Sequence, residues 1–162
     1  MTPEQAVECA EIITSLYPNT AGKTAVVNAY ARQLAPFPYR FVGEVLSQFP
    51  SRYDGEFCPT VHEIFDALAW RYKALVNDAV RQEADRIYPL RYTTGDDEHR
   101  KHFVIIASAK CFQKLGTHEC MAALRAGIRP SEYVEKNKPS ALGPREGGPI
   151  DPPHWAKRGL EP

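Results

Sequence analysis

The sequence has no long apolar run and no excess of charge of either sign. Its most apolar stretch, Phe103 to Ala107, is far shorter than the roughly 20 residues that span a bilayer. Its 20 basic residues balance its 20 acidic ones, so no overall field attracts the chain to nucleic acid or to an anionic membrane. A local basic patch is still compatible with this balance. We therefore expect no membrane-spanning segment and no membrane partner.

Cysteine is scarce and scattered. The residues from Met1 to Glu4 lack the basic and apolar regions of a signal peptide, so we expect a cytosolic protein with reduced thiols. A structural zinc ion needs four converging ligands. The sequence contains no Cys-x-x-Cys pair, which would supply two of them. The sequence therefore predicts no metal site. The four cysteines are Cys9, Cys58, Cys111 and Cys120.

The glycines of a phosphate-binding loop are also missing. Ala21-Gly22-Lys23-Thr24 resembles the end of such a loop, but Tyr17 occupies the position where the pattern needs its first glycine. Without the glycines the backbone N–H groups cannot form a phosphate cradle, so these residues predict a helix start. Acidic and basic residues interleave between Asp66 and Arg86, as on a solvated helix face. We expect no enzymatic activity, no catalytic residue and no cofactor.

Proline, in contrast, is abundant. Many of the 14 prolines recur every few residues from Pro130 to Pro162, among several glycines. Such a composition cannot bury enough apolar surface to fold, so we predict that residues 128–162 form a flexible tail. Tyr133 and Trp155 are isolated aromatic residues within it. Aromatic anchors in disordered segments can fold onto a partner, so both are candidate partner-binding residues, although an inert tail fits the composition equally well.

The clearest local signal is a helix start within Phe57–Ile64. Thr60 and Glu63 have the spacing of a capping box, and Pro59 directly before the cap favours an extended chain entry. After Val61, apolar residues recur at three- and four-residue steps, with no glycine or proline until Pro89. We therefore predict a helix from about Val61 to about Ile87, with structural capping roles for the proline, the threonine and the glutamate.

Prolines divide the preceding sequence into three short helical segments. They cover about Pro3–Pro18, Asn19–Pro36 and Pro38–Pro50. Each segment has one apolar stripe and would not be stable alone. We expect all three to pack around the N-terminal half of the long helix, in a helical domain that comprises residues 1–89.

Residues 90–127 predict two further helices, over about Glu98–Leu115 and from Thr117 to about Ala126. The short apolar run at 103–107 also fits a strand, but the sequence offers no second strand to pair with it. Basic residues outnumber acidic ones in the section 98–125, which is either a solvated basic face or a surface that binds DNA. The candidate binding residues are Arg100, Lys101, Lys110 and Lys114, with Arg125 nearby.

These patterns predict an all-α protein. It comprises a small bundle of short helices packed on one long helix (residues 1–89), two further helices (90–127) and a disordered C-terminal tail (128–162). No internal repeat is visible in the sequence.

Four short sequence features follow one another between Ile12 and Leu68. In order, they are Leu16-Tyr17-Pro18 at the end of the first helix, Tyr30 followed by Leu34 in the second, Phe37-Pro38-Tyr39 before the third, and Phe57-x-Pro59-Thr60-Val61-x-Glu63-Ile64 at the start of the long helix. This order and spacing resemble the phage replicative-helicase loader and inhibitor family. Two positions depart from the family's pattern, since Cys58 stands where proline is common and Tyr30 where tryptophan is.

The resemblance implies a non-enzymatic protein with a helical N-terminal domain and a flexible C-terminal part. Proteins of that family bind the hexameric replicative helicase, hold it inactive and deliver it to an origin-bound initiator. By resemblance we expect a DNA-replication adaptor of a phage or prophage, located in the host cytosol. Two alternatives stay open: a protein that binds DNA directly through the section 98–125, and an anti-host phage protein that inhibits a host helicase or nuclease.

Overall fold

The protein folds as an elongated assembly of helices. The computed structural model describes residues 1–17, 19, 23–48, 57–88 and 94–139, with no account of the side chains of 94–96, and the regular structure in these ranges is helical. The predicted all-α class is therefore confirmed, and 103–107 lie within a helix. The helices are α1 (Pro3–Ser15), α2 (Thr24–Leu34), α3 (Tyr39–Gln48), α4 (Val61–Ile87), α5 (Thr94–Phe112), α6 (Thr117–Arg125) and α7 (Pro130–Asn137).

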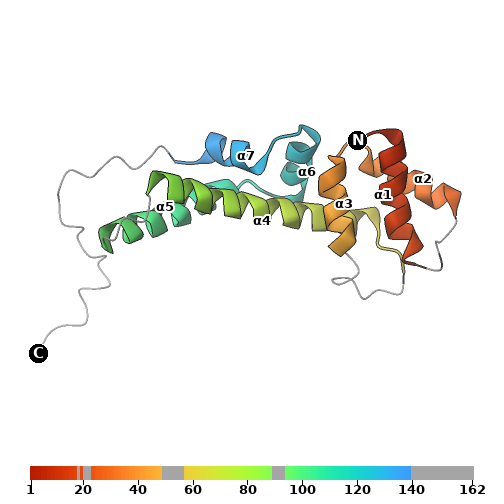
Figure 1. The fold of residues 1–162 in the computed structure, drawn as a ribbon, viewed down its shortest axis with the longest axis horizontal. Helices are drawn as coiled ribbons and strands as arrows, with labels where there is room; N and C mark the ends of the chain where they lie inside the picture. Colours follow the sequence, from red (N-terminus) through yellow and green to blue (C-terminus); the bar gives the residue numbers. More distant parts are fainter. Residues whose placement is uncertain (18, 20–22, 49–56, 89–93, 140–162) are drawn as a thin grey trace, which may run out of the picture.

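The long helix α4 is the axis of the molecule. Figure 1 shows α1, α2 and α3 grouped at its N-terminal end, while α5, α6 and α7 lie along the rest of its length. α4 begins at the capping box that its sequence predicts, because the Thr60 hydroxyl accepts from the Glu63 N–H at 3.3 Å and the Glu63 carboxylate accepts from the Thr60 N–H at 2.6 Å. Its buried positions recur at helical spacing: Ile64, Leu68, Ala69, Tyr72, Val76, Ala79, Val80 and Ala84.

The three short N-terminal helices do not surround α4 equally. α1 and α2 pack closely on each other through Ala6, Ala10 and Ala31, because small side chains let two helix backbones approach. α1 also packs on α3, and α3 makes the main contact of the group with α4. The arrangement therefore differs from the predicted one, in which all three short helices packed around the N-terminal half of α4.

Glycines mark the two ends of α6. Gly116 precedes the helix with a φ of −72°, and the first side chain of α6, Thr117, donates its hydroxyl to the Asp66 carboxylate of α4 at 3.0 Å. Gly127 follows the helix with a φ of +68°, a backbone conformation that glycine adopts without strain. The chain reverses at Gly127, which returns the next segment to α4.

Residues 130–137 are helical, so the flexible tail predicted from residue 128 onward is wrong for this segment. Pro130 occupies the first turn of α7, where a missing N–H costs no hydrogen bond, and Val134 is fully buried in the main core. The Arg129 N–H donates to the Glu132 carboxylate at 3.2 Å, which satisfies a free backbone donor at the helix start. The rest of the predicted tail, from residue 140, lies outside the described residues.

The first half of α7 is held in place by Tyr72 in the middle of α4. The Tyr72 hydroxyl donates to the Ile128 carbonyl at 3.1 Å, and its ring meets that of Tyr133 edge-on, with the centroids 6.3 Å apart. Burial raises the pKa of Tyr72 above its ordinary value. The hydroxyl therefore stays protonated and keeps donating over the whole physiological range.

An ionic contact holds the other end of α7. The Lys138 ammonium lies 2.6 Å from the Glu83 carboxylate of α4 and 2.7 Å from that of Glu135. Glu83 also accepts two hydrogen bonds from Arg86, at 2.8 and 2.6 Å, and its side chain is only 13% exposed. The hydrogen bonds from Arg86, followed by those from Lys138, lower the pKa of Glu83 to about 2.

We predict that Thr60→Ala lowers the free energy of unfolding by about 1 kcal/mol, because it removes the side-chain acceptor of the α4 cap. Thr60→Ser keeps the hydroxyl and should unfold close to the wild-type midpoint. Urea titration followed by circular dichroism measures both. A loss as large for the serine variant as for the alanine variant would show that the hydroxyl is not the stabilising group.

We also predict an acid-sensitive contribution from Glu83. Because its folded pKa lies below the ordinary value of 4.5, the contribution is fully present above about pH 5 and is lost as the pH falls toward about 2. It amounts to at most about 3 kcal/mol. Glu83→Gln should therefore flatten the decline of the free energy of unfolding in this pH range.

The matched control for Glu83→Gln is Asp78→Asn. Asp78 lies on the same helix, is exposed and forms no ion pair within the described ranges. Its substitution should leave the acid dependence as in the wild type. Equal acid dependence of the two variants, measured by urea unfolding at several pH values, would contradict a special role for Glu83.

Candidate interaction surfaces

Several of the residues that carry the resemblance to the loader family come together in space. The Tyr30 hydroxyl of α2 donates to the Pro59 carbonyl just before α4, and the Cys58 thiol lies 3.5 Å from the same hydroxyl. The Phe37 ring meets the Phe65 ring edge-on, with the centroids 5.4 Å apart. These contacts form one connected junction between the N-terminal helices and α4. The junction core also buries Tyr17, Leu34 and Ile64.

Pro59, Thr60 and Glu63 belong to this junction as structural residues. Pro59 is buried and presents its carbonyl to Tyr30, while the other two form the cap of α4. Their polar groups are therefore used within the protein. These three residues of the stretch therefore position helices.

Two of the predicted cations in α5 are paired with carboxylates. Arg100 donates to Asp85 of α4 at 2.6 Å, and Lys101 lies 2.5 Å from Asp97, one turn earlier in α5. The hydrogen bond with Asp85 raises the pKa of Arg100 further above its ordinary value. A phosphate that bound either cation would have to compete with the carboxylate already present.

The remaining cations of this section do not gather into one patch. The Arg125 guanidinium lies over the Phe37 ring, 5.2 Å from its centroid, so it packs on the junction core. Lys110 and Lys114, one turn apart, are exposed and form no ion pair within the part of the chain that the structure describes. Two lysines supply only a small, salt-sensitive affinity for phosphates.

Tyr133 was predicted to be an anchor for a partner in a disordered tail. In the structure it lies in α7 and is partly buried against Tyr72, and burial raises the pKa of its hydroxyl. Its ring contact is therefore intramolecular and fixes α7 on α4. Trp155, the second predicted anchor, lies outside the described residues.

Some large apolar side chains are exposed, which sequence reasoning missed. Leu16 follows the last residue of α1, Ser15, and is 46% exposed. Ile12, one turn earlier, is 37% exposed. The other exposed large apolar residues among those described are Phe57, Trp70 and Ile105.

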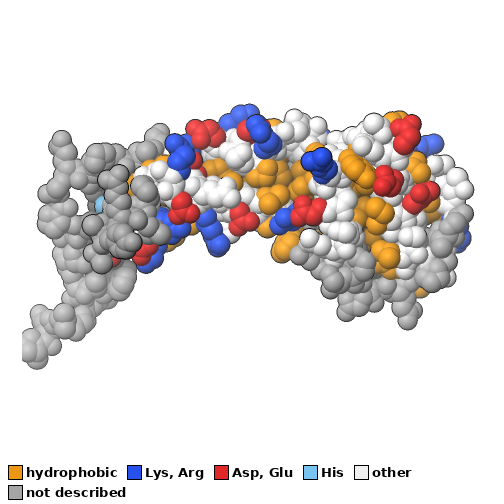
Figure 2. All heavy atoms as spheres, viewed as in Figure 1, with side chains coloured by type: hydrophobic (Ala, Val, Ile, Leu, Met, Phe, Trp, Pro, Cys, Tyr) orange, Lys and Arg blue, Asp and Glu red, His pale blue; other side chains and the backbone are white. Residues whose placement is uncertain are grey.

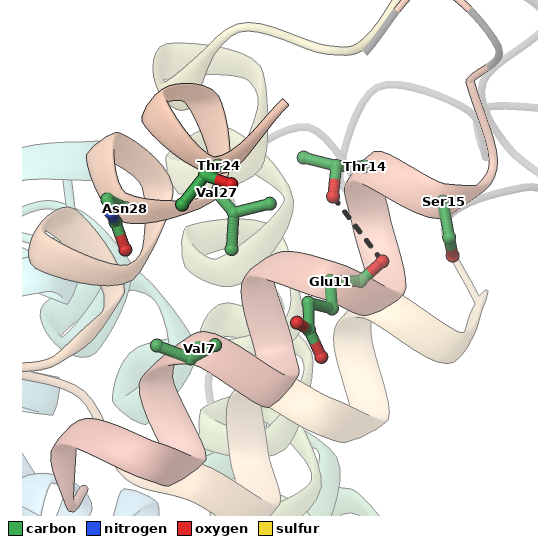
Figure 3. Close-up of a pocket in the computed structure, with 7 residues that line it drawn as sticks. All are labelled: Val7, Glu11, Thr14, Ser15, Thr24, Val27 and Asn28. Atoms are coloured by element: carbon green, nitrogen blue, oxygen red, sulfur yellow. Dashed lines mark hydrogen bonds between the residues drawn. The ribbon is translucent and has the colours of Figure 1, made fainter. Parts of the chain in front are cut away.

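A groove of about 420 Å³ lies between α1 and α2 (Figure 3). Its apolar surface comes from Val7 and Val27, one on each helix. The Thr14 hydroxyl at its edge donates to the Ala10 carbonyl at 2.9 Å and lies 3.5 Å from the Glu11 carbonyl. The remaining described lining residues are Ser15, Thr24 and Asn28, so Glu11 is the one charged group among the described residues of the lining.

The described residues offer little for covalent or metal chemistry. No group of three or more histidine, cysteine or acidic side chains within the described ranges is placed to hold a metal ion. The cysteines are free, and burial raises the pKa of the Cys9, Cys111 and Cys120 thiols, which disfavours the reactive thiolate. Among the described helices, none has both the length and the apolar character to cross a membrane.

Comparison with known proteins returned no relative. No protein-family model, no curated protein and no solved structure matches the chain.

Because Tyr133 packs on Tyr72, we predict that Tyr133→Ala lowers the free energy of unfolding by about 2 to 3 kcal/mol. Tyr133→Phe keeps the ring and should cost less than about 1 kcal/mol. Thermal unfolding of the two variants and the wild type measures the difference. An alanine variant as stable as the wild type would show that α7 does not depend on this contact.

Proposed function

We propose that this protein is a non-enzymatic adaptor in the DNA replication of a phage or prophage, which binds the hexameric replicative helicase and loads or inhibits it. The observation that carries this proposal is the resemblance of Ile12–Leu68 to the helicase loader and inhibitor family. The structure adds a physical reason to take the resemblance seriously. A set of similar residues supports a shared domain more strongly when its members contact one another than when they are scattered.

Several of the matched residues do contact one another at the junction between the N-terminal helices and α4, although Leu16 and Phe57 are exposed. The two departures from the family's pattern are also neighbours, since the Cys58 thiol lies 3.5 Å from the Tyr30 hydroxyl. They therefore represent one local change in packing rather than two independent ones. That change is accommodated by the hydrogen bond from Tyr30 to the Pro59 carbonyl.

In this proposal the adaptor acts by binding alone. The junction and α4 form the scaffold, and the second helical section provides a contact surface for the helicase. One face of α5 carries the exposed Ile105, with Lys101 and His102 one turn before it and Ala109 one turn after it. We take this exposed isoleucine, with Ala109 beside it, as the centre of the proposed contact, because apolar residues occupy the buried core of protein–protein interfaces.

The proposal predicts that the purified protein co-elutes with a bacterial hexameric replicative helicase on sizing chromatography, in the presence or absence of ATP. Ile105→Asp should weaken the complex, since a charge would enter the centre of the proposed contact. Gln82→Asp, at an exposed position of α4, is the matched control and should elute as the wild type does.

The absence of a complex in both nucleotide states would remove the main support for this function. The same samples can then be titrated with labelled DNA at two salt concentrations. Binding at low salt that is lost in Lys110→Ala/Lys114→Ala would support direct DNA binding in its place.

A further inference from the structure

The charge of α1 is of one sign. Glu4, Glu8 and Glu11 are exposed, and none of the 13 residues of the helix is Lys or Arg. No salt bridge in the described ranges involves these three carboxylates, although Glu8 accepts a hydrogen bond from the Tyr39 hydroxyl. Their spacing of four and three residues places them in one stripe along the helix. The stripe thus has a negative charge that no side chain of the described fold neutralises.

Apolar surface borders this acidic stripe. The groove between α1 and α2 contributes Val7 and Val27, and Glu11 belongs both to the stripe and to the groove wall (Figure 3). Ile12 and Leu16 are also exposed, but at about 100° per residue they lie on the other side of the stripe from Val7 and outside the groove. At the end of the molecule where α1 lies, Figure 2 shows red acidic side chains next to an orange apolar band. We call the acidic stripe and the groove together the α1 face.

We infer that the α1 face is a docking surface for a basic amphipathic helix of a partner protein. The apolar side of such a helix would cover the valines of the groove, while its Lys and Arg residues would lie along the glutamates that border the groove. The C-terminal end of α1 adds the negative end of a helix dipole, which no basic residue of its last turn offsets. This inference does not depend on the helicase proposal.

The charge of the α1 face decides between classes of partner. Nucleic acid and anionic lipid surfaces present phosphates, which the three glutamates repel. Lys23, at the start of α2, is the cation next to the groove, because Thr24 after it lines the groove wall. In the proposed complex, the basic residues of the partner helix therefore lie next to Glu4, Glu8 and Glu11, and they avoid the part of the groove next to Lys23, where like charges would repel.

The test uses the full chain, isotope-labelled for NMR, and a synthetic helix-forming peptide of leucine and lysine with about four amphipathic turns. Saturable binding should shift the amide signals of Val7, Glu11, Val27 and Asn28. Glu8→Gln/Glu11→Gln should weaken the binding about fivefold to tenfold, since it removes two exposed charge pairs. Glutamine preserves the shape of each side chain, and circular dichroism checks that the variant is folded.

The matched control is Asp78→Asn/Glu98→Gln, which removes two exposed carboxylates of α4 and α5 that also lack an ion pair in the described ranges. It should bind the peptide with wild-type affinity. Equal affinity of the two double variants would overturn the inference, as would shifts confined to α4 through α7. A peptide of leucine and glutamate that bound as tightly as the basic one would overturn it too, because the acidic stripe would then not select the partner.

Discussion

The fold depends on covering one continuous apolar stripe on α4. The helix has 27 residues, a length of about 40 Å, and its fully buried positions extend from Ile64 to Ala84. No short helix can cover such a stripe, so the chain brings α3 to its beginning and α5, α6 and α7 to the rest. Each of these helices would be marginal on its own. α4 is therefore the template on which both halves of the chain are ordered.

Local rules were sufficient to predict the helices whose ends are set by neighbouring residues. Thr60 and Glu63 are three residues apart, so their spacing alone specifies the cap of α4. α7 has local signals as well, since Pro130 lies in its first turn and Glu132 accepts from the Arg129 N–H, but its order also depends on Tyr72, which is distant in the sequence. A proline-rich composition averaged over residues 128–162 concealed a short ordered segment within it. Residues 130–137 are thus ordered by tertiary contacts, although the composition of the surrounding segment predicts disorder.

At the candidate surfaces, too, contacts between residues close in the sequence could be predicted, and contacts between different helices could not. The pair of Lys101 with Asp97 follows from helical spacing, whereas the pair of Arg100 with Asp85 joins two helices and has no sequence signal. A count of basic residues therefore overestimated the charge available for phosphate binding. Conversely, the exposure of Leu16 required knowledge of where α1 ends. The spacing of Glu4, Glu8 and Glu11 was visible in the sequence, but their lack of cationic partners was not.

The distance between the two proposed contact surfaces has a consequence for the proposed adaptor. The negative stripe of α1 lies at one end of α4, while the proposed helicase contact around Ile105 lies on α5, which runs along the remainder (Figure 1). In this proposal, two partners bind at once without overlapping. Because α4 is one uninterrupted helix with a packed core on both halves, it would fix the distance between them. An adaptor that holds one protein in a set position relative to another needs this rigidity more than it needs a large interface.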